Sequence, residues 1–245
     1  MFRTRGAFNR RRLAAVLLLL ELFISGLRPL PGASAQIVLP GDERSYVSNQ
    51  NSLVLPVIFN SFQIPVSKIY CMGDSLTEAG VYETELVALL GSGWETINLG
   101  RSGDKTSDMF ARFQADVIDR GDADYVLIWG GVVDLYSPTT EDTETYLQAM
   151  YTMAHNTGIK VVAVNIIPLS DITDPNKIRL LEINSWISVT AINVDYLVDV
   201  YTAIEDPDNP GNILPVYDSG DHVHLSNAGY TIVAETIYNA VTWTR

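Results

Sequence analysis

The sequence predicts an α/β fold: a three-layer α/β/α sandwich around a flavodoxin-like, five-stranded parallel sheet with right-handed crossovers. Two observations predict it. Short apolar runs alternate with amphipathic runs of helical spacing from Ser67 to the end of the 245-residue chain. Apolar residues make up 47% of the chain, enough for a sizeable core. Alternating strands and helices favour a parallel sheet that is covered on both faces.

The elements follow in order along this part of the chain. Five apolar runs have the length of buried strands, and they cover residues 68–72, 95–99, 125–129, 160–166 and 194–198. Five longer runs carry helical spacing, and they cover residues 82–90, 106–118, 141–155, 176–191 and 226–242. Either Ser226 or Asn227 is a suitable cap for the last helix.

Residues 1–35 have the features of a secretory signal peptide. A basic start precedes an apolar run from Leu13 that Glu21 interrupts, and Ala33-Ser34-Ala35 forms an A-x-A cleavage site. The alternative is an uncleaved membrane anchor, which the short, interrupted apolar run favours less. We therefore expect a secreted protein that begins at Gln36 and has no stable membrane association after cleavage.

The chain beyond the signal peptide is strongly acidic. Residues 1–35 hold six of the 16 basic residues and one of the 29 acidic residues, which leaves ten basic and 28 acidic residues and a net charge of −18. Such a surface repels nucleic acid and anionic membranes, and it suits neutral substrates. Residues 36–66 are turn-rich and indicate a linker or N-terminal extension, so we expect the main domain to cover residues 67–245.

Two sequence features point to nucleophilic catalysis. Gly73-Asp74-Ser75-Leu76 follows the first strand and places the Ser75 hydroxyl at the carboxyl end of that strand, where open α/β sheets bind ligands. Far away, Asp221 precedes His224 by three residues, a spacing that can put both side chains on one side of a turn. Serine, histidine and carboxylate together are the parts of a serine hydrolase. His222 competes with His224 as the base.

Four blocks in this order resemble the GDSL, or SGNH, hydrolase family, and the resemblance covers about residues 68–242. Each block alone is short, but the four occur in the family's order on loops that end strands. The blocks are Gly73-Asp74-Ser75-Leu76, Asn98-Leu99-Gly100-Arg101-Ser102-Gly103-Asp104, Gly131-Val132-Val133-Asp134 and Asp221-His222-Val223-His224-Leu225.

The resemblance implies a triad in which Ser75 is the nucleophile, His224 the base and Asp221 the carboxylate that orients it. It also implies an oxyanion hole with the backbone N–H groups of Ser75 and Gly103. Because a serine, a histidine and a carboxylate suffice for this chemistry, we expect no cofactor and no metal. The third block departs from the family pattern, because Val133 stands where the family has an asparagine. Valine has no side-chain donor, so one of three oxyanion contacts is missing.

Two function classes follow from these residues. The first is a secreted serine esterase that hydrolyses acyl or acetyl esters of small molecules or carbohydrates, with activity weakened by Val133. The second is a catalytically impaired module of the same fold that binds carbohydrate. A Gly-x-Ser-x-Gly elbow and a Gly-x-Gly-x-x-Gly loop are both absent from the sequence, which excludes a classical α/β-hydrolase and a dinucleotide-binding protein.

Overall fold

A computed structural model of the protein describes residues 65–137 and 139–245. The predicted signal peptide and residues 36–64 of the predicted extension lie outside the described residues. Within the described part, five parallel strands form one sheet in the order β2-β1-β3-β4-β5, which is the flavodoxin-like order and confirms the predicted fold class. The strands are β1 (Ser67–Gly73), β2 (Trp94–Gly100), β3 (Tyr125–Trp129), β4 (Lys160–Val164) and β5 (Tyr196–Val198).

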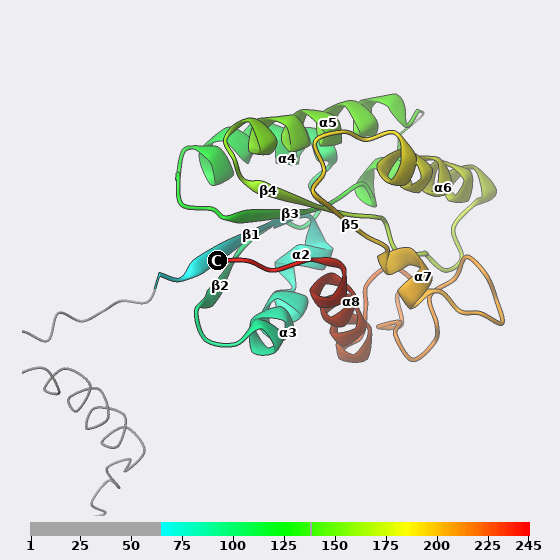
Figure 1. The fold of residues 1–245 in the computed structure, drawn as a ribbon. Coiled ribbons are helices and arrows are strands. Elements are labelled where there is room, and N and C mark those ends of the chain that lie inside the picture. The colour runs from blue at the N-terminus through cyan, green and yellow to red at the C-terminus, as the bar shows by residue number, and fades with distance from the viewer. Residues whose placement is uncertain (1–64, 138) are drawn as a thin grey trace, which may run out of the picture. The chain divides into compact units, whose positions relative to one another are not determined.

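Helices cover both faces of the sheet (Figure 1). Helices α4 and α5 lie together on one face and α3 and α8 lie together on the other, so the domain has three layers. The longer helices are α3 (Val81–Leu90), α4 (Thr106–Phe113), α5 (Glu141–Asn156), α6 (Asp174–Val189) and α8 (Asn227–Ala240). None of the helices within the described residues is both long and apolar enough to cross a lipid bilayer.

The sequence patterns missed the shorter elements. These are α2 (Ser75–Glu78), the 3₁₀ turn η2 (Val133–Tyr136) and α7 (Val200–Ile204), whereas the π-helical turn η1 (Gln114–Ile118) lies within a predicted helix. A segment of four or five residues is too short to show a helical period, so hydrophobic spacing cannot reveal it. The predicted helix over residues 106–118 is α4 followed directly by η1, and Ser226 is the cap of α8, since its side chain accepts a hydrogen bond from Gly229 N–H.

The centre of the sheet is the core of the domain. All five residues of β3 are buried, and so are four of the five in β4. The edge strand β2 is more open, with exposed and half-buried residues along its length. A central strand that is buried on both faces is the pattern of a sheet sandwiched between helices, and it gives the loops at its ends a rigid support.

The strands end level with one another at the edge that carries the predicted site. Gly73 at the end of β1 pairs with Gly100 on β2 and with Trp129 on β3. The loops that follow these three strands therefore start side by side. They hold the first three sequence blocks, which explains how residues far apart in the chain come to share one edge of the sheet.

Helix α2 lies so close to these strand ends that only glycine fits beneath it. A Cβ atom on Gly73 would come within 2.1 Å of the Thr77 hydroxyl oxygen and within 2.6 Å of the Trp129 carbonyl oxygen. A Cβ atom on Gly100 would come within 2.1 Å of the backbone nitrogen of Glu78. Gly100 thus lets the backbone of α2 lie directly on β2, and Gly73 leaves room for the Thr77 side chain, so that α2 and its first residue, Ser75, are fixed on the sheet.

Candidate active site

Ser75 is the first residue of α2, directly beyond the end of β1. Asp74 precedes it as the helix cap, and its Oδ1 atom accepts a hydrogen bond from Leu76 N–H at 3.0 Å. Asp74 is buried, whereas Ser75 is half-buried. The Gly-Asp-Ser order therefore has a local reason: glycine permits the close packing, aspartate caps the helix, and serine is left at the surface of the site.

The structure brings together the three residues that the sequence singled out. Nε2 of His224 lies 2.9 Å from Oγ of Ser75, although the two residues are 149 positions apart in the chain. Nδ1 of His224 lies 2.7 Å from Oδ2 of Asp221. The imidazole thus joins the carboxylate to the hydroxyl, which is the geometry of a nucleophile, its base and an orienting group.

The proton on the imidazole can be assigned from its neighbours. Asp221 accepts hydrogen bonds from the backbone N–H and the imidazole of His224, from Val223 N–H and from the Ser219 hydroxyl. These contacts, that of the His224 backbone first, hold the pKa of Asp221 well below its usual range, so the group is a carboxylate at neutral pH. Because a carboxylate only accepts, Nδ1 of a neutral His224 carries the proton, and Nε2 is free to accept the Ser75 hydroxyl proton.

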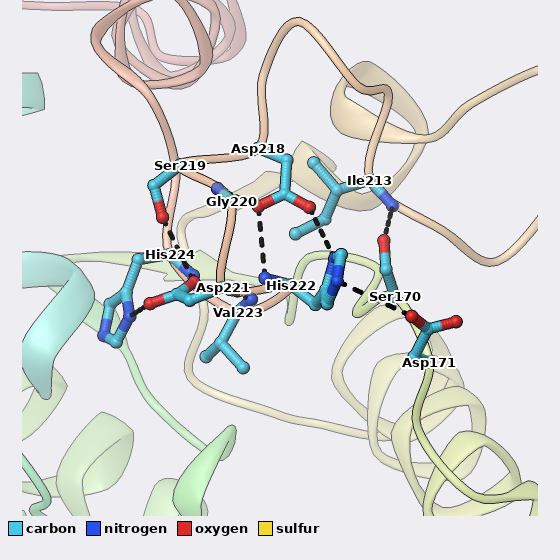
Figure 2. Close-up of polar contacts among 10 residues, drawn as sticks. All are labelled: Ser170, Asp171, Ile213, Asp218, Ser219, Gly220, Asp221, His222, Val223 and His224. Atoms are coloured by element: carbon cyan, nitrogen blue, oxygen red, sulfur yellow. Dashed lines mark hydrogen bonds and ion pairs between the residues drawn. The ribbon is translucent and has the colours of Figure 1, made fainter.

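The same loop holds a second Asp–His pair that faces another way, and Figure 2 shows both pairs. Nδ1 of His222 lies 2.9 Å from Oδ2 of Asp218, and its Nε2 lies 3.6 Å from Oδ2 of Asp171. The His222 carbonyl accepts a hydrogen bond from Ser170 N–H. His222 therefore ties the loop to the segment after β4 and does not contact Ser75, so the structure places His224, and not His222, in position to act as a base.

The second sequence block supplies a free backbone donor near the strand ends. Gly103 has φ +80°, a left-handed conformation that favours glycine. Neither its N–H group nor that of Ser75 donates a hydrogen bond to any described residue. The block is attached to β1 through Arg101, whose N–H donates to the Gly73 carbonyl at 3.1 Å.

The third block is joined to the second through Asp134. Its buried carboxylate accepts hydrogen bonds from the Thr106 N–H at 3.0 Å and from the Thr106 hydroxyl at 2.7 Å, and so it caps helix α4. Its neighbour Val133 is the first residue of η2 and is half-buried. With both carboxylate oxygens directed at Thr106, Asp134 has a structural partner, and the side chain of Val133 has no polar atom.

Two buried acids lie behind the serine. Burial raises the pKa of Asp74 to about 6, and the neighbouring Asp134 adds to that rise. Burial also raises the pKa of Glu83, on α3, to about 8. Asn98 contacts both Glu83 Oε1, at 2.8 Å, and the Thr77 carbonyl in α2, at 2.6 Å. Among the described residues, Oδ2 of Asp74 and Oε2 of Glu83 have no hydrogen-bond partner.

Sequence reasoning missed two charged side chains that are largely buried, those of Glu83 and Arg112. Glu83 and Arg112 lie in predicted helices, and an acid or a base in an amphipathic helix of an acidic chain is normally exposed to water. The only signal for Arg112 was its position in the helix that directly follows the second block.

In residues 65–137 and 139–245, no three His, Cys, Asp or Glu side chains are placed to hold a metal ion together.

A flavodoxin-like sheet with Ser75 and His224 in contact at its carboxyl edge is the arrangement of the SGNH hydrolase fold. The chain belongs to the GDSL-like lipase/acylhydrolase family, since the model of that family matches residues 71–232, well over half of the 245 residues. It is therefore a member of a family of esterases and acylhydrolases, and the resemblance drawn from the four blocks is confirmed. None of the curated proteins matches the chain.

Solved structures show the same fold. A GDSL-like lipase from Bacteroides thetaiotaomicron is 22% identical, with a TM-score of 0.61 over 73% of this chain and 91% of its own. The acetyl xylan esterase AlAXEase is 25% identical, with a TM-score of 0.60 over 71% of this chain and 100% of its own. An acetylxylan esterase from Geobacillus stearothermophilus is 21% identical, with a TM-score of 0.60 over 72% and 94%.

The buried Glu83 gives a testable pH dependence of stability. In the folded state its carboxyl holds a proton up to about pH 8, whereas in the unfolded chain it loses the proton near the ordinary glutamate pKa of 4.5. The ionisation of Glu83 therefore lowers the free energy of unfolding as the pH rises from about 4.5 to about 8. We expect Glu83→Gln, which stays neutral, to gain stability relative to wild type as the pH rises, at up to about 1.4 kcal/mol per pH unit.

The measurement is the free energy of unfolding by denaturant at several pH values between about 5 and 8 for both proteins. Glu85→Gln, on the exposed side of the same helix, controls for the loss of one acidic side chain. Parallel curves for wild type and Glu83→Gln would mean that Glu83 is not a buried, proton-holding group.

Proposed function

We propose that the protein is a secreted serine esterase that hydrolyses carboxylic esters, acyl or acetyl, through Ser75, His224 and Asp221. The observation that carries the proposal is the 2.9 Å contact of Ser75 Oγ with His224 Nε2, continued by the 2.7 Å contact of His224 Nδ1 with Asp221. Membership of a family of esterases and acylhydrolases supports the reaction type.

The proposed reaction has two acyl transfers. Ser75 Oγ attacks the ester carbonyl carbon while His224 Nε2 takes the hydroxyl proton, and Asp221 stabilises the imidazolium that forms. As the C–O bond to the alcohol breaks, His224 returns the proton to the leaving oxygen. A water molecule then attacks the acyl-enzyme, gives its proton to His224, and Ser75 leaves with that proton as the acid is released.

The negative charge that develops on the carbonyl oxygen would be held by backbone donors. The N–H groups of Ser75 and Gly103 are free of other described partners, which supports this role. Val133 provides no third donor. Loss of one such donor typically slows turnover by about 10²–10³-fold, so we expect a weakened enzyme with its base and nucleophile intact.

The proposed substrates are neutral esters of small molecules or carbohydrates. The net charge of −18 beyond residue 35 disfavours anionic partners. Two of the structural neighbours are acetyl xylan esterases. A pocket of about 330 Å³ that Asp218 and His222 line, but Ser75 and His224 do not, has hydroxyl, amide and carboxylate side chains in its wall, the kinds of groups that bind sugar hydroxyls.

A second candidate function is a catalytically impaired module of this fold that binds carbohydrate. The observation that favours it is Val133 at the asparagine position. The two candidates differ in one measurable property: an esterase turns over a short-chain aryl ester through Ser75, whereas a binding module does not.

The first test of the proposal concerns the triad. Ser75→Ala and His224→Ala should each lower kcat for a short-chain aryl ester by at least about 10³-fold without unfolding the protein, and the double variant should be scarcely worse than either single variant, because the residues act as a unit. A fluorophosphonate should label wild type at Ser75, as read by peptide mass spectrometry.

His222→Asn is the matched control, because His222 is the other Asp-paired histidine of the same loop. Asparagine tolerates the left-handed backbone that His222 adopts, with φ +70°. This variant should keep most of its activity. Full activity in Ser75→Ala, or labelling at a different serine, is the result that would refute the mechanism.

The second test concerns Val133. Val133→Asn adds a donor that is directed at charge present only in the transition state, so it should raise kcat with much less effect on KM. We expect a gain of about tenfold or more. It is smaller than the loss typical for removing such a donor, since a site shaped around valine holds the new amide imperfectly.

Kinetics of folded wild type and Val133→Asn on the same aryl ester measure this change. Val133→Thr, which keeps the branched shape, is the control for local repacking. An unchanged or lower kcat in Val133→Asn would show that residue 133 does not face the developing charge.

The third test concerns secretion, which rests on the basic, apolar and A-x-A segments of residues 1–35. N-terminal sequencing of protein exported by a secreting host should give Gln36 as the first residue. Recovery of the chain in the membrane fraction with Met1–Ala35 retained would favour the anchor instead.

A further inference from the structure

The side chain of Arg112, in helix α4, makes hydrogen bonds with three residues from three different segments. Its side chain is only 9% exposed. Nε donates to Oδ2 of Asp104 at 2.8 Å, Nη1 to Oδ2 of Asp116 at 3.1 Å, and Nη2 to the carbonyl oxygen of Gly73 at 3.2 Å. All three nitrogens of the guanidinium are therefore engaged, each with a different residue.

Two of these partners flank the proposed oxyanion donors. Gly73 lies two residues before Ser75, and Asp104 lies one residue after Gly103. The donors themselves belong to separate segments, one at the start of α2 and the other in the loop after β2. Arg112 thus connects the backbone of one donor segment to the side chain of the other.

Only arginine can make this set of contacts. Its planar fork presents five N–H donors in fixed directions, so one side chain can bind two carboxylates and a carbonyl at once. The ammonium of a lysine is a single point from which these three acceptors are not reached together. Loss of the charge would also leave Asp104 and Asp116 beside each other, mostly buried, with less compensation.

We propose that Arg112 is a positioning residue that sets the spacing between the Ser75 and Gly103 N–H groups. The inference rests on the proposed function, because it assigns a task within that oxyanion hole. The hole lacks the side-chain donor at residue 133, so its two backbone donors carry the stabilisation of the developing charge. A displacement of about one ångström between them is enough to cost about 10²-fold in rate.

A purely structural ion pair is the alternative, and Arg101 provides the matched control for it. Arg101 Nη2 binds the same Oδ2 atom of Asp116 at 3.0 Å, but its side chain is 58% exposed and makes no side-chain contact with Gly73 or Asp104. Arg101→Lys therefore perturbs an ion pair with Asp116 and leaves the link between the two donor segments in place.

The experiment compares Arg112→Lys, Arg112→Met and Arg101→Lys with wild type. For each folded protein, kcat and KM are measured with a short-chain aryl ester, together with the inhibition constant of an aryl boronic acid, which forms a tetrahedral anionic adduct with a nucleophilic serine. Arg112→Met should lower kcat by about 10–100-fold with KM changed less than about threefold, and it should weaken boronate binding by a similar factor to kcat. Arg112→Lys should fall between Arg112→Met and wild type.

Asp104→Asn is the second variant, and it keeps the proposal testable if Arg112→Met does not fold. It should also lower kcat selectively, and its effect should not add fully to that of Arg112→Lys, since both variants alter the contact between residues 112 and 104. The pH dependence of kcat should stay that of wild type, because the triad contacts are unchanged. Equal kcat and boronate affinity in Arg112→Lys and Arg101→Lys, with Asp104→Asn also unaffected, would overturn the proposal.

Ser75→Ala, assayed in parallel, separates this outcome from failure of the proposed function. If wild type is active and Ser75→Ala is not, a null result at Arg112 refutes only the positioning role. If Ser75→Ala is as active as wild type, the proposed triad fails, and the positioning role fails with it.

Discussion

The contact of α2 with the ends of β1 and β2 is the constraint on which the rest of the site depends. At Gly100 the backbones of β2 and α2 meet directly, and at Gly73 the Thr77 side chain of α2 occupies the space that a Cβ atom would need. The backbone contact at Gly100 has no side chain that can rotate to relieve a shift, so the helix has one place to lie. As the first residue of α2, Ser75 is held in position with the helix. The sheet edge thereby provides a rigid base for a nucleophile, which catalytic geometry requires.

The loop over residues 218–224, which holds both Asp–His pairs, brings a histidine from near the C-terminus of the chain to Ser75. Both of its aspartates bind backbone N–H groups of their own loop as well as a histidine. The loop is thus shaped by its carboxylates, and each histidine direction follows from that shape. Hydrogen bonds from Gly220 and His222 outweigh burial and lower the pKa of Asp218, so this loop carries two carboxylates near neutral pH. One orients the imidazole toward Ser75, and the other anchors the loop to the segment after β4.

Local patterns in the sequence were sufficient for the sheet, because each long strand and helix carries its own period. They also singled out Ser75 and the Asp221–His224 pair, since those residues stand in short blocks with fixed spacing. The spacing and the family pattern favoured His224 over His222, although the two histidines share one loop and the same type of partner. That choice is made by contacts with Ser75 and Asp171, which lie far away in the chain. Arg112 was missed for a related reason, because its three partners come from three different segments.

Arg112 also affects the charge around the proposed oxyanion hole, because it neutralises one of the nearby carboxylates. Asp74, Asp104 and Asp134 lie near one another, and the last two contribute to raising the pKa of the first. Negative charge that appears on a substrate oxygen beside these acids would be opposed by them. Asp134 is offset by its bonds to Thr106, and the raised pKa of Asp74 lets that group hold a proton below about pH 6. The charge of Asp104 is neutralised by the guanidinium of Arg112. A guanidinium that both spaces the donors and neutralises the nearest loop carboxylate lets two backbone N–H groups act where the third donor of the family is replaced by Val133.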